Sequence, residues 1–274
     1  MDILTEVVDA LQLRATAVQR LSVLPELRED LHSGEAALLI VIRGDVTAVT
    51  ASGDRSLVEN DYVLLVGAQA ARFTSTTPQT EVIRCRYSLQ TSLPHPLARQ
   101  LPSVLSMGVR YLTDRSELGR AVELLENELV NTRLGSEFVT VRLAEIAFVE
   151  VLRKRQLEDQ PEPAFLAALS DSPVRTGLDL IHRSPNRAWR VDELADGAGL
   201  SRGAFAERFH KRVGDPPLRY LRAWRMLNAR RELARGGVPV REVAARAGYR
   251  SANGFSRAFR RLFGHPPSVL RRVS

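Results

Sequence analysis

The sequence has few of the residues that build disulfides, metal sites and membrane spans. Among 274 residues there is one cysteine, Cys85, which excludes an intrachain disulfide and indicates a reducing compartment. Of five histidines, only His32 lies in the region that reads as β, so we expect neither a metal site nor a metal-dependent enzyme. No apolar run approaches the ~20 residues of a membrane helix, and no basic-then-apolar leader opens the chain. These absences predict a cytoplasmic protein without a cofactor or a membrane partner.

Lysine is also scarce, and arginine carries almost all of the positive charge. Lys154 and Lys211 are the only lysines among 39 basic residues. Residues 1–170 contain 17 basic and 23 acidic residues, whereas residues 171–274 contain 22 basic and 9 acidic residues. A local basic excess is typical of a module that binds nucleic-acid phosphates. The alternative is a solvated basic face without a partner.

Residues 194–222 are repeated, with changes, at residues 243–272. The first copy shares nine positions with the second: Ala195, Ala198, Gly199, Ser201, Phe205, Phe209, Gly214, Pro216 and Pro217 match Ala244, Ala247, Gly248, Ser251, Phe255, Phe259, Gly264, Pro266 and Pro267. Glycine suits a left-handed turn residue and serine suits a helix N-cap, so each copy predicts a helix, a tight turn and a second helix. Two such units on a basic background favour a protein that reads double-stranded DNA in two adjacent grooves.

The second helix of each unit has an anchoring face and an outward face. Phe255 and Phe259 share one face by helical periodicity, and Asn253 and Arg257 point the opposite way. Asparagine can bond adenine and arginine can bond guanine, each through two hydrogen bonds. Other basic side chains of the two units are candidates for phosphate contacts: Arg202, Arg208, Lys211, Arg212, Arg250, Arg260 and Arg261.

A connector separates the two units. Pro216-Pro217 opens a predicted helix that runs to about Ala234 and stops at Gly236-Gly237. A rigid helix here could hold the two recognition helices about one DNA turn, ~34 Å, apart.

The amino-terminal part has a different organisation. Residues 10–90 read as short strands between turn signals, as in a small barrel or sandwich. Residues 114–158 read as two helices with apolar stripes, which form either ordinary core or a subunit interface. The stripes are Leu118, Val122, Leu125 and Leu129, then Val139, Leu143, Ile146 and Leu152.

The carboxy-terminal residues resemble a known family. WRVDELADGAGLSRGAFAERF, YLRAWRMLNARREL and VREVAARAGYRSANGFSRAFRRLFGHPP, within residues 175–272, resemble the DNA-binding domain of AraC/XylS-type transcriptional regulators. The resemblance implies that outward positions of the recognition helices contact base edges. Those positions are Gly203, Ala206 and Glu207 in the first unit and Asn253, Ser256 and Arg257 in the second.

The amino-terminal half is similar to the cupin-type sensor domain of one branch of that family. ALLIVIRGDVTAV, the Asn60-Asp61 step before YVLLV, and PHPLARQLPSVL carry the similarity. It implies a small-molecule effector inside the barrel, for which His32, Phe73, Cys85 and Tyr87 are candidate lining residues; the alternative, favoured for each residue taken alone, is that it is simply core. Strand alternation places Ile83, Cys85 and Tyr87 on one face, which we expect to point inward. Cys85 then reads as a buried thiol, with a redox sensor as the alternative.

Together these patterns predict an α+β chain. A cupin-like β-barrel (1–106) precedes a helical dimerisation or linker region (107–170) and an all-α domain (171–274) with two helix-turn-helix units. We expect a homodimeric, sequence-specific DNA-binding regulator that is not an enzyme. Its partners would be promoter DNA, possible small-molecule effectors and, if it activates transcription, RNA polymerase. The alternatives are an architectural DNA-binding protein without an effector and a cupin enzyme with a DNA-binding appendage.

Overall fold

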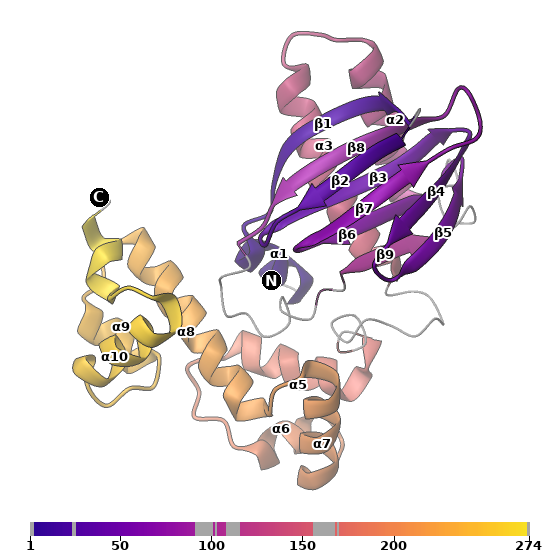
Figure 1. Cartoon of the computed structure of the whole chain (residues 1–274). Coiled ribbons are helices and arrows are strands. Elements are labelled where there is room, and N and C mark those ends of the chain that lie inside the picture. Colours follow the sequence, from indigo (N-terminus) through magenta and orange to yellow (C-terminus); the bar gives the residue numbers. More distant parts are fainter. Residues whose placement is uncertain are drawn as a thin grey trace. The chain divides into compact units, whose positions relative to one another are not determined.

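The computed structural model divides the chain into two compact units (Figure 1). The structure describes residues 3–23, 26–90, 101, 103–107, 116–155, 168 and 170–272. A β unit comprises Gln12–Gln90 and Pro102–Asp159, and a helical unit comprises Met1–Leu11, Thr91–Leu101 and Gln160–Ser274. No described helix is both long enough and apolar enough to span a membrane. The predicted α+β class is confirmed, whereas the boundaries at residues 106 and 170 stay a prediction.

Two antiparallel sheets form the β unit. The nine strands of the described chain are β1 (Arg14–Ser22), β2 (Glu26–Leu31), β3 (Glu35–Arg43), β4 (Asp45–Thr50), β5 (Gly53–Val58), β6 (Tyr62–Val66), β7 (Gln69–Thr74), β8 (Glu81–Ser88) and β9 (Val104–Met107). One sheet has the order β1-β8-β3-β6-β9 and the other the order β2-β7-β4-β5. Within the described ranges the two sheets do not join into a closed barrel, so the cupin-like domain is a pair of sheets rather than the barrel expected from the sequence.

The core between the sheets is apolar and filled. Alternate residues of β3, namely Ala37, Leu39 and Val41, belong to it, and Phe73 of β7 is fully buried in it. The other face of β3 is also buried, because helix α3 (Ser136–Arg155) covers this sheet. β3 is therefore an uninterrupted apolar run, as expected of a strand buried on both faces.

The alternation predicted for β8 is confirmed, but the expected direction of its apolar face is wrong. Ile83, Cys85 and Tyr87 do not point between the sheets. The Tyr87 hydroxyl donates to the Ala144 carbonyl of α3 at 2.9 Å, and its ring packs edge-on against Phe148. A helix covering the outer face of the sheet makes that face apolar, which strand periodicity alone does not reveal.

Arginines from β8 instead lie on the side of the second sheet. Arg84 and Arg86 both pair with the fully buried Glu29 of β2, at 2.7 and 2.9 Å. The ion pairs and the hydrogen bonds that accompany them compensate the buried carboxylate, which is why charged side chains are tolerated here.

Helices α2 (Glu117–Val130) and α3 form a hairpin in the β unit. The stripe predicted for α2 is mostly buried, with Leu129 half-buried. For the stripe of α3, the core interpretation is wrong at Val139 and Ile146, which are 38% and 49% exposed, whereas the alternative of a subunit interface stays a prediction. The buried face of α3 is instead formed by Ala144, Ala147, Phe148, Val151 and Leu152. Large apolar side chains that remain exposed on the hairpin are Leu124, Val130, Leu134, Phe138, Val139 and Ile146.

The helical unit contains the repeat. Its described helices are α1 (Ile3–Leu11), α5 (Ser172–Arg183), α6 (Val191–Gly197), α7 (Arg202–Val213), α8 (Pro217–Arg235), α9 (Val240–Arg246), α10 (Ala252–Phe263) and the 3-10 helix η2 (Pro267–Arg272). The two helix-turn-helix units are α6–α7 and α9–α10, joined by α8 as predicted (Figure 1).

The two copies of the repeat share their N-cap hydrogen bond and the way their recognition helices end. Ser201 accepts from the Ala204 amide, and Ser251 accepts from the Gly254 amide, so both serines are N-caps. Gly214 and Gly264 end the recognition helices with the same left-handed φ of 79°. The local chemistry of the repeat therefore produces the same cap hydrogen bond and the same left-handed helix end twice.

A close approach of helices holds the first unit together. A Cβ added to Gly177 of α5 would lie 2.6 Å from the Phe205 ring of α7, so glycine is needed there. Phe205 and Phe209 are fully buried, as are Phe255 and Phe259 in the second unit. The anchoring faces predicted from periodicity are thus confirmed.

The first helix of the chain, α1, belongs to the helical unit. Buried Glu6 bonds Nδ1 of His182 in α5 through Oε2 at 2.6 Å, and the Tyr220 hydroxyl of α8 lies 2.7 Å from Nε2 of that ring. Trp224 stacks on His182 with ring centroids 4.3 Å apart. Arg231 also donates to the Glu6 carbonyl at 3.2 Å. The network ties α1 to two helices of the carboxy-terminal part.

Candidate nucleic-acid interface and signal site

The recognition helices α7 and α10 turn a polar face toward solvent. Of the six residues expected at base edges, Gly203, Glu207, Asn253 and Arg257 are exposed, and Ala206 and Ser256 are half-buried. The buried phenylalanines on the opposite face fix this orientation. The exposed side chains of α10 are the larger hydrogen-bonding groups, so the second unit offers the richer chemistry for base recognition.

All seven basic residues expected at phosphates are exposed: Arg202, Arg208, Lys211, Arg212, Arg250, Arg260 and Arg261. Their exposure leaves each of them able to approach a DNA backbone. Their roles in phosphate binding stay predictions.

Ion pairs distinguish the two units. In the first, Arg202 lies 3.5 Å from Asp192, and Arg208 and Arg212 both pair with Asp171. In the second, no carboxylate of the described residues forms an ion pair with Arg250, Arg257, Arg260 or Arg261. The second unit therefore presents more uncompensated positive charge.

Sequence reasoning missed the role of Asp171. This residue is the N-cap of α5, and its side chain is 2% exposed. Its sequence signal was its position before Ser172-Pro173, where an acidic N-cap is common. Nothing local connected it with arginines about 40 positions later.

The four residues expected to line an effector cavity are not gathered in one place. His32 is exposed after β2, and Phe73 lies in the core between the sheets. Cys85 and Tyr87 lie on the other face of their sheet, beneath α3. The prediction that these four residues line one cavity is therefore wrong, because Phe73 points between the sheets, whereas Cys85 and Tyr87 point away from the space between them.

Cys85 is a buried thiol. It is fully buried, and burial raises its pKa to about 12, although a hydrogen bond with Tyr87 acts in the opposite direction. A reactive cysteine needs a lowered pKa and solvent access. The structure thus favours the core interpretation of Cys85 over the redox sensor.

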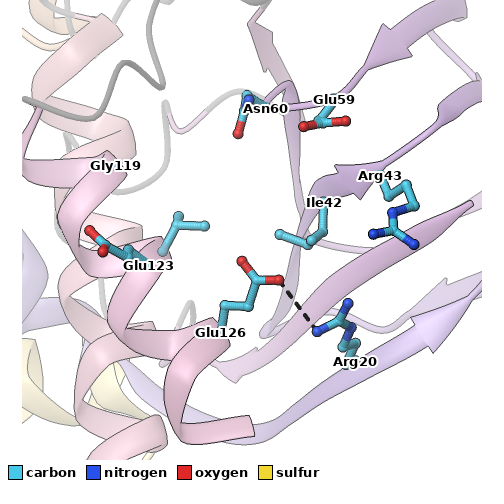
Figure 2. A pocket seen from close by; sticks show the side chains of 9 residues that line it. Arg20, Ile42, Arg43, Glu59, Asn60, Gly119, Glu123 and Glu126 are labelled. Carbon is cyan, nitrogen blue, oxygen red and sulfur yellow. Dashed lines mark hydrogen bonds and ion pairs between the residues drawn. The ribbon is translucent and has the colours of Figure 1, made fainter. Parts of the chain in front are cut away.

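A pocket of about 440 Å³ opens elsewhere in the β unit (Figure 2). Its lining comes from α2, β1, the end of β3 and the turn after β5: Arg20, Ile42, Arg43, Glu59, Asn60, Gly119, Val122, Glu123 and Glu126. Arg20 bridges Glu81 at 2.6 Å and Glu126 at 3.3 Å, and it thereby joins β1 to α2 at the pocket wall. The hydrogen bond to Glu81 raises the pKa of Arg20. The volume suits a small polar molecule.

Residues of the types that bind metal ions do not cluster into a metal site in the part of the chain that the structure describes. There, no group of three or more histidine, cysteine, aspartate or glutamate residues has a geometry that could hold a metal ion.

Comparisons with known proteins match both units. Residues 194–273 match a family described as a helix-turn-helix domain, and residues 2–155 match a family described as cupin. A putative AraC-like transcription regulator of Streptomyces lividans is 39% identical over 154 residues, which cover 56% of this chain and 50% of that protein. The chain thus spans about half the length of the first curated relatives that it matches.

Two further similarities extend over most of the chain. The HTH-type transcriptional regulator AlkR of Acinetobacter baylyi is 23% identical over 312 aligned positions, which cover 100% of both chains. The crystal structure of ToxT from Vibrio cholerae, bound to an unsaturated fatty acid, is 14% identical and covers 94% of each chain with a TM-score of 0.40.

Proposed function

Because the chain belongs to the AraC-type regulators that carry an amino-terminal cupin domain, we propose that it regulates transcription by binding specific DNA. The helical unit reads the DNA, and the β unit receives a signal. The relatives are named as transcription regulators, and we assign the chain no enzymatic activity.

The pair of recognition helices carries this proposal. α7 and α10 share their serine N-caps, their left-handed glycine ends and their paired buried phenylalanines. Their opposite faces are exposed and carry basic residues. Such helices can enter the major groove of DNA while neighbouring arginines contact phosphates.

Sequence readout is assigned mainly to the second unit. Asn253 and Arg257 are exposed on α10, and Arg257 has no ion-pair partner among the described residues. Gly203 and Ala206 offer α7 no polar side chain, and Glu207 is repelled by phosphate. The first unit then contributes chiefly to backbone contacts.

The signal site is assigned to the pocket lined by α2, β1, the end of β3 and the turn after β5. The space between the sheets is filled by core side chains, whereas this pocket is open and polar. A bound molecule that contacts Arg20 or Glu126 would change the link between β1 and α2. Because α2 and α3 also expose apolar side chains, we assign to this hairpin the interface of a homodimer.

A second candidate is an architectural DNA-binding protein without an effector. The filled core between the sheets favours it. Such a protein would bind DNA with little sequence preference, so one experiment separates the two functions.

The test is selection of bound duplexes from a random DNA pool by the full-length protein. A regulator enriches one motif, with two contacted segments about one helical turn, ~34 Å, apart. Tight binding without enrichment identifies the architectural protein. No binding even at low salt overturns both functions. RNA polymerase is the expected partner if the motif lies where an activator acts, and the cytoplasm is the expected compartment.

A further inference from the structure

Arg208 and Arg212 of the first recognition helix share one buried carboxylate. Arg208 Nε donates to both oxygens of Asp171, at 2.9 and 2.8 Å, and Arg212 Nε lies 3.3 Å from Oδ2. The carboxylate also accepts from the Val174 amide at 3.3 Å. Asp171 is thus fixed at the start of α5, and it fixes two arginines one helical turn apart on α7.

Each arginine bonds Asp171 through Nε, on the edge of the guanidinium group that faces the carboxylate, which we call its inner edge. The terminal nitrogens of both guanidinium groups make no hydrogen bond with a described residue. The side chains of Arg208 and Arg212 are 48% and 45% exposed, while that of Asp171 is 2% exposed. The carboxylate is therefore shielded from solvent, whereas the outer edges of the two guanidinium groups face the solvent.

Arg208 and Arg212 also line a hollow of about 450 Å³ on the first recognition helix. Its lining consists of Leu200, Ala204, Glu207, Arg208, Lys211 and Arg212. Three of these six side chains are cationic and one, Glu207, is anionic, so the lining carries a net positive charge. A guanidinium with a free edge can bind a phosphate through two parallel hydrogen bonds.

The second unit shows that the fold does not require this cluster. By the offset of the repeat, Arg208 and Arg212 correspond to Ala258 and Leu262. Those residues pack against the apolar core of the second unit. A helix-turn-helix unit can therefore be closed at this point by apolar contacts alone, and the first unit uses ionic ones.

We propose that Asp171 is a positioning residue, whose buried carboxylate holds Arg208 and Arg212 so that their outer edges, together with Lys211, form a cradle for DNA backbone phosphates. Preordering the two arginines reduces the entropy lost when DNA binds. The proposal rests on the proposed function, because it assumes that α7 approaches DNA.

The direction in which one substitution changes the affinity for DNA tests the proposal. Asp171→Asn removes one negative charge, so charge alone predicts tighter DNA binding. If Asp171 instead positions the two arginines, the same substitution weakens DNA binding. For the full-length protein we expect an affinity about tenfold weaker, equivalent to one charge-assisted hydrogen bond. The slope of log K against log salt should become shallower by about one for each phosphate that the variant no longer binds.

Asp215→Asn is the matched control. Asp215 is also buried and pairs with Arg219 of α8 at 3.1 Å, but it does not contact Arg208 or Arg212 in the described bonds. The same change of charge there should leave DNA affinity unchanged or raise it. Thermal unfolding of both variants shows whether they are folded at the assay temperature.

A charge-preserving variant decides the matter if Asp171→Asn does not fold. The double substitution Arg208→Lys with Arg212→Lys keeps both charges for Asp171 but removes the second edge of each guanidinium. It should weaken binding by at least as much as Asp171→Asn. The proposal is overturned if Asp171→Asn binds more tightly than the wild type, or if the lysine pair binds equally well. Absence of DNA binding by the wild-type protein would instead overturn the proposed function.

Discussion

Glu6 and His182 are 176 positions apart in the chain, yet their side chains bond at 2.6 Å. Both are buried, and Tyr220 occupies the other ring nitrogen of the histidine. The DNA-binding half is consequently completed by residues from the opposite end of the chain.

Replacing Glu6 by alanine should destabilise the helical unit. His182 would lose one partner in a buried site, which costs about 1–3 kcal/mol of the free energy of unfolding. Chemical denaturation of the full-length protein measures the change. Asp9→Ala is the control, because Asp9 lies in the same helix but is exposed. Equal stability of the two variants would show that the network does not hold α1 in place.

Two arginines of α10 should differ in the kind of contact that they make with DNA. We expect Arg257→Ala to cost about 1–3 kcal/mol at a specific site and to relax preference at one base pair, because the substitution removes a bidentate hydrogen bond to a base. Arg260→Ala should weaken binding to all sequences about equally and reduce the salt dependence. Titration of each variant with a specific and a scrambled duplex distinguishes them. If Arg257→Ala lowers both affinities by one factor, Arg257 contacts phosphate.

Placing a charge on the exposed apolar face of the α2–α3 hairpin should separate the subunits of the expected dimer. Val139 and Ile146 are seven residues apart on α3 and share a face. Ile146→Glu would bury an unpaired carboxylate in the interface, which is strongly unfavourable. Sedimentation should show a monomer for this variant and a dimer for Arg28→Glu, an exposed control on strand β2, outside the hairpin. A monomeric wild-type protein at micromolar concentration would contradict the assignment.

Cys85 should not react in the folded protein. Burial raises its pKa to about 12, so that at pH 8 almost no thiolate forms. Alkylating reagents should label it only after unfolding, when the thiol regains solvent access and an ordinary pKa. Rapid labelling of the native protein at pH 8 would restore the redox interpretation of this residue.

The sequence predicts the helix-turn-helix units well because their signals are local. Serine N-caps, left-handed glycines and phenylalanines four residues apart each act within one or two helical turns. They fix which side of α7 and α10 is exposed. The positions of Asn253 and Arg257 could therefore be derived before the structure.

Contacts between distant residues could not be derived in this way. Alternation in β8 separates Cys85 from Arg84, but only the helix packed outside the sheet decides which of them points between the sheets. The same holds for Asp171, whose arginines lie on another helix, and for Glu29, whose partners lie on another sheet. In each case a buried charge finds its partner through tertiary packing.

The placement of α1 has a thermodynamic consequence. Since α1 and α5 belong to one compact unit, the β unit is covalently an insertion within the helical unit. If the β unit unfolds, the chain between α1 and α5 becomes a long flexible loop. Holding α1 in place then costs the entropy that is lost when this loop is closed. A molecule that stabilises the folded β unit thereby also stabilises the attachment of α1. The unfolding transitions of the two units are coupled through the polypeptide itself.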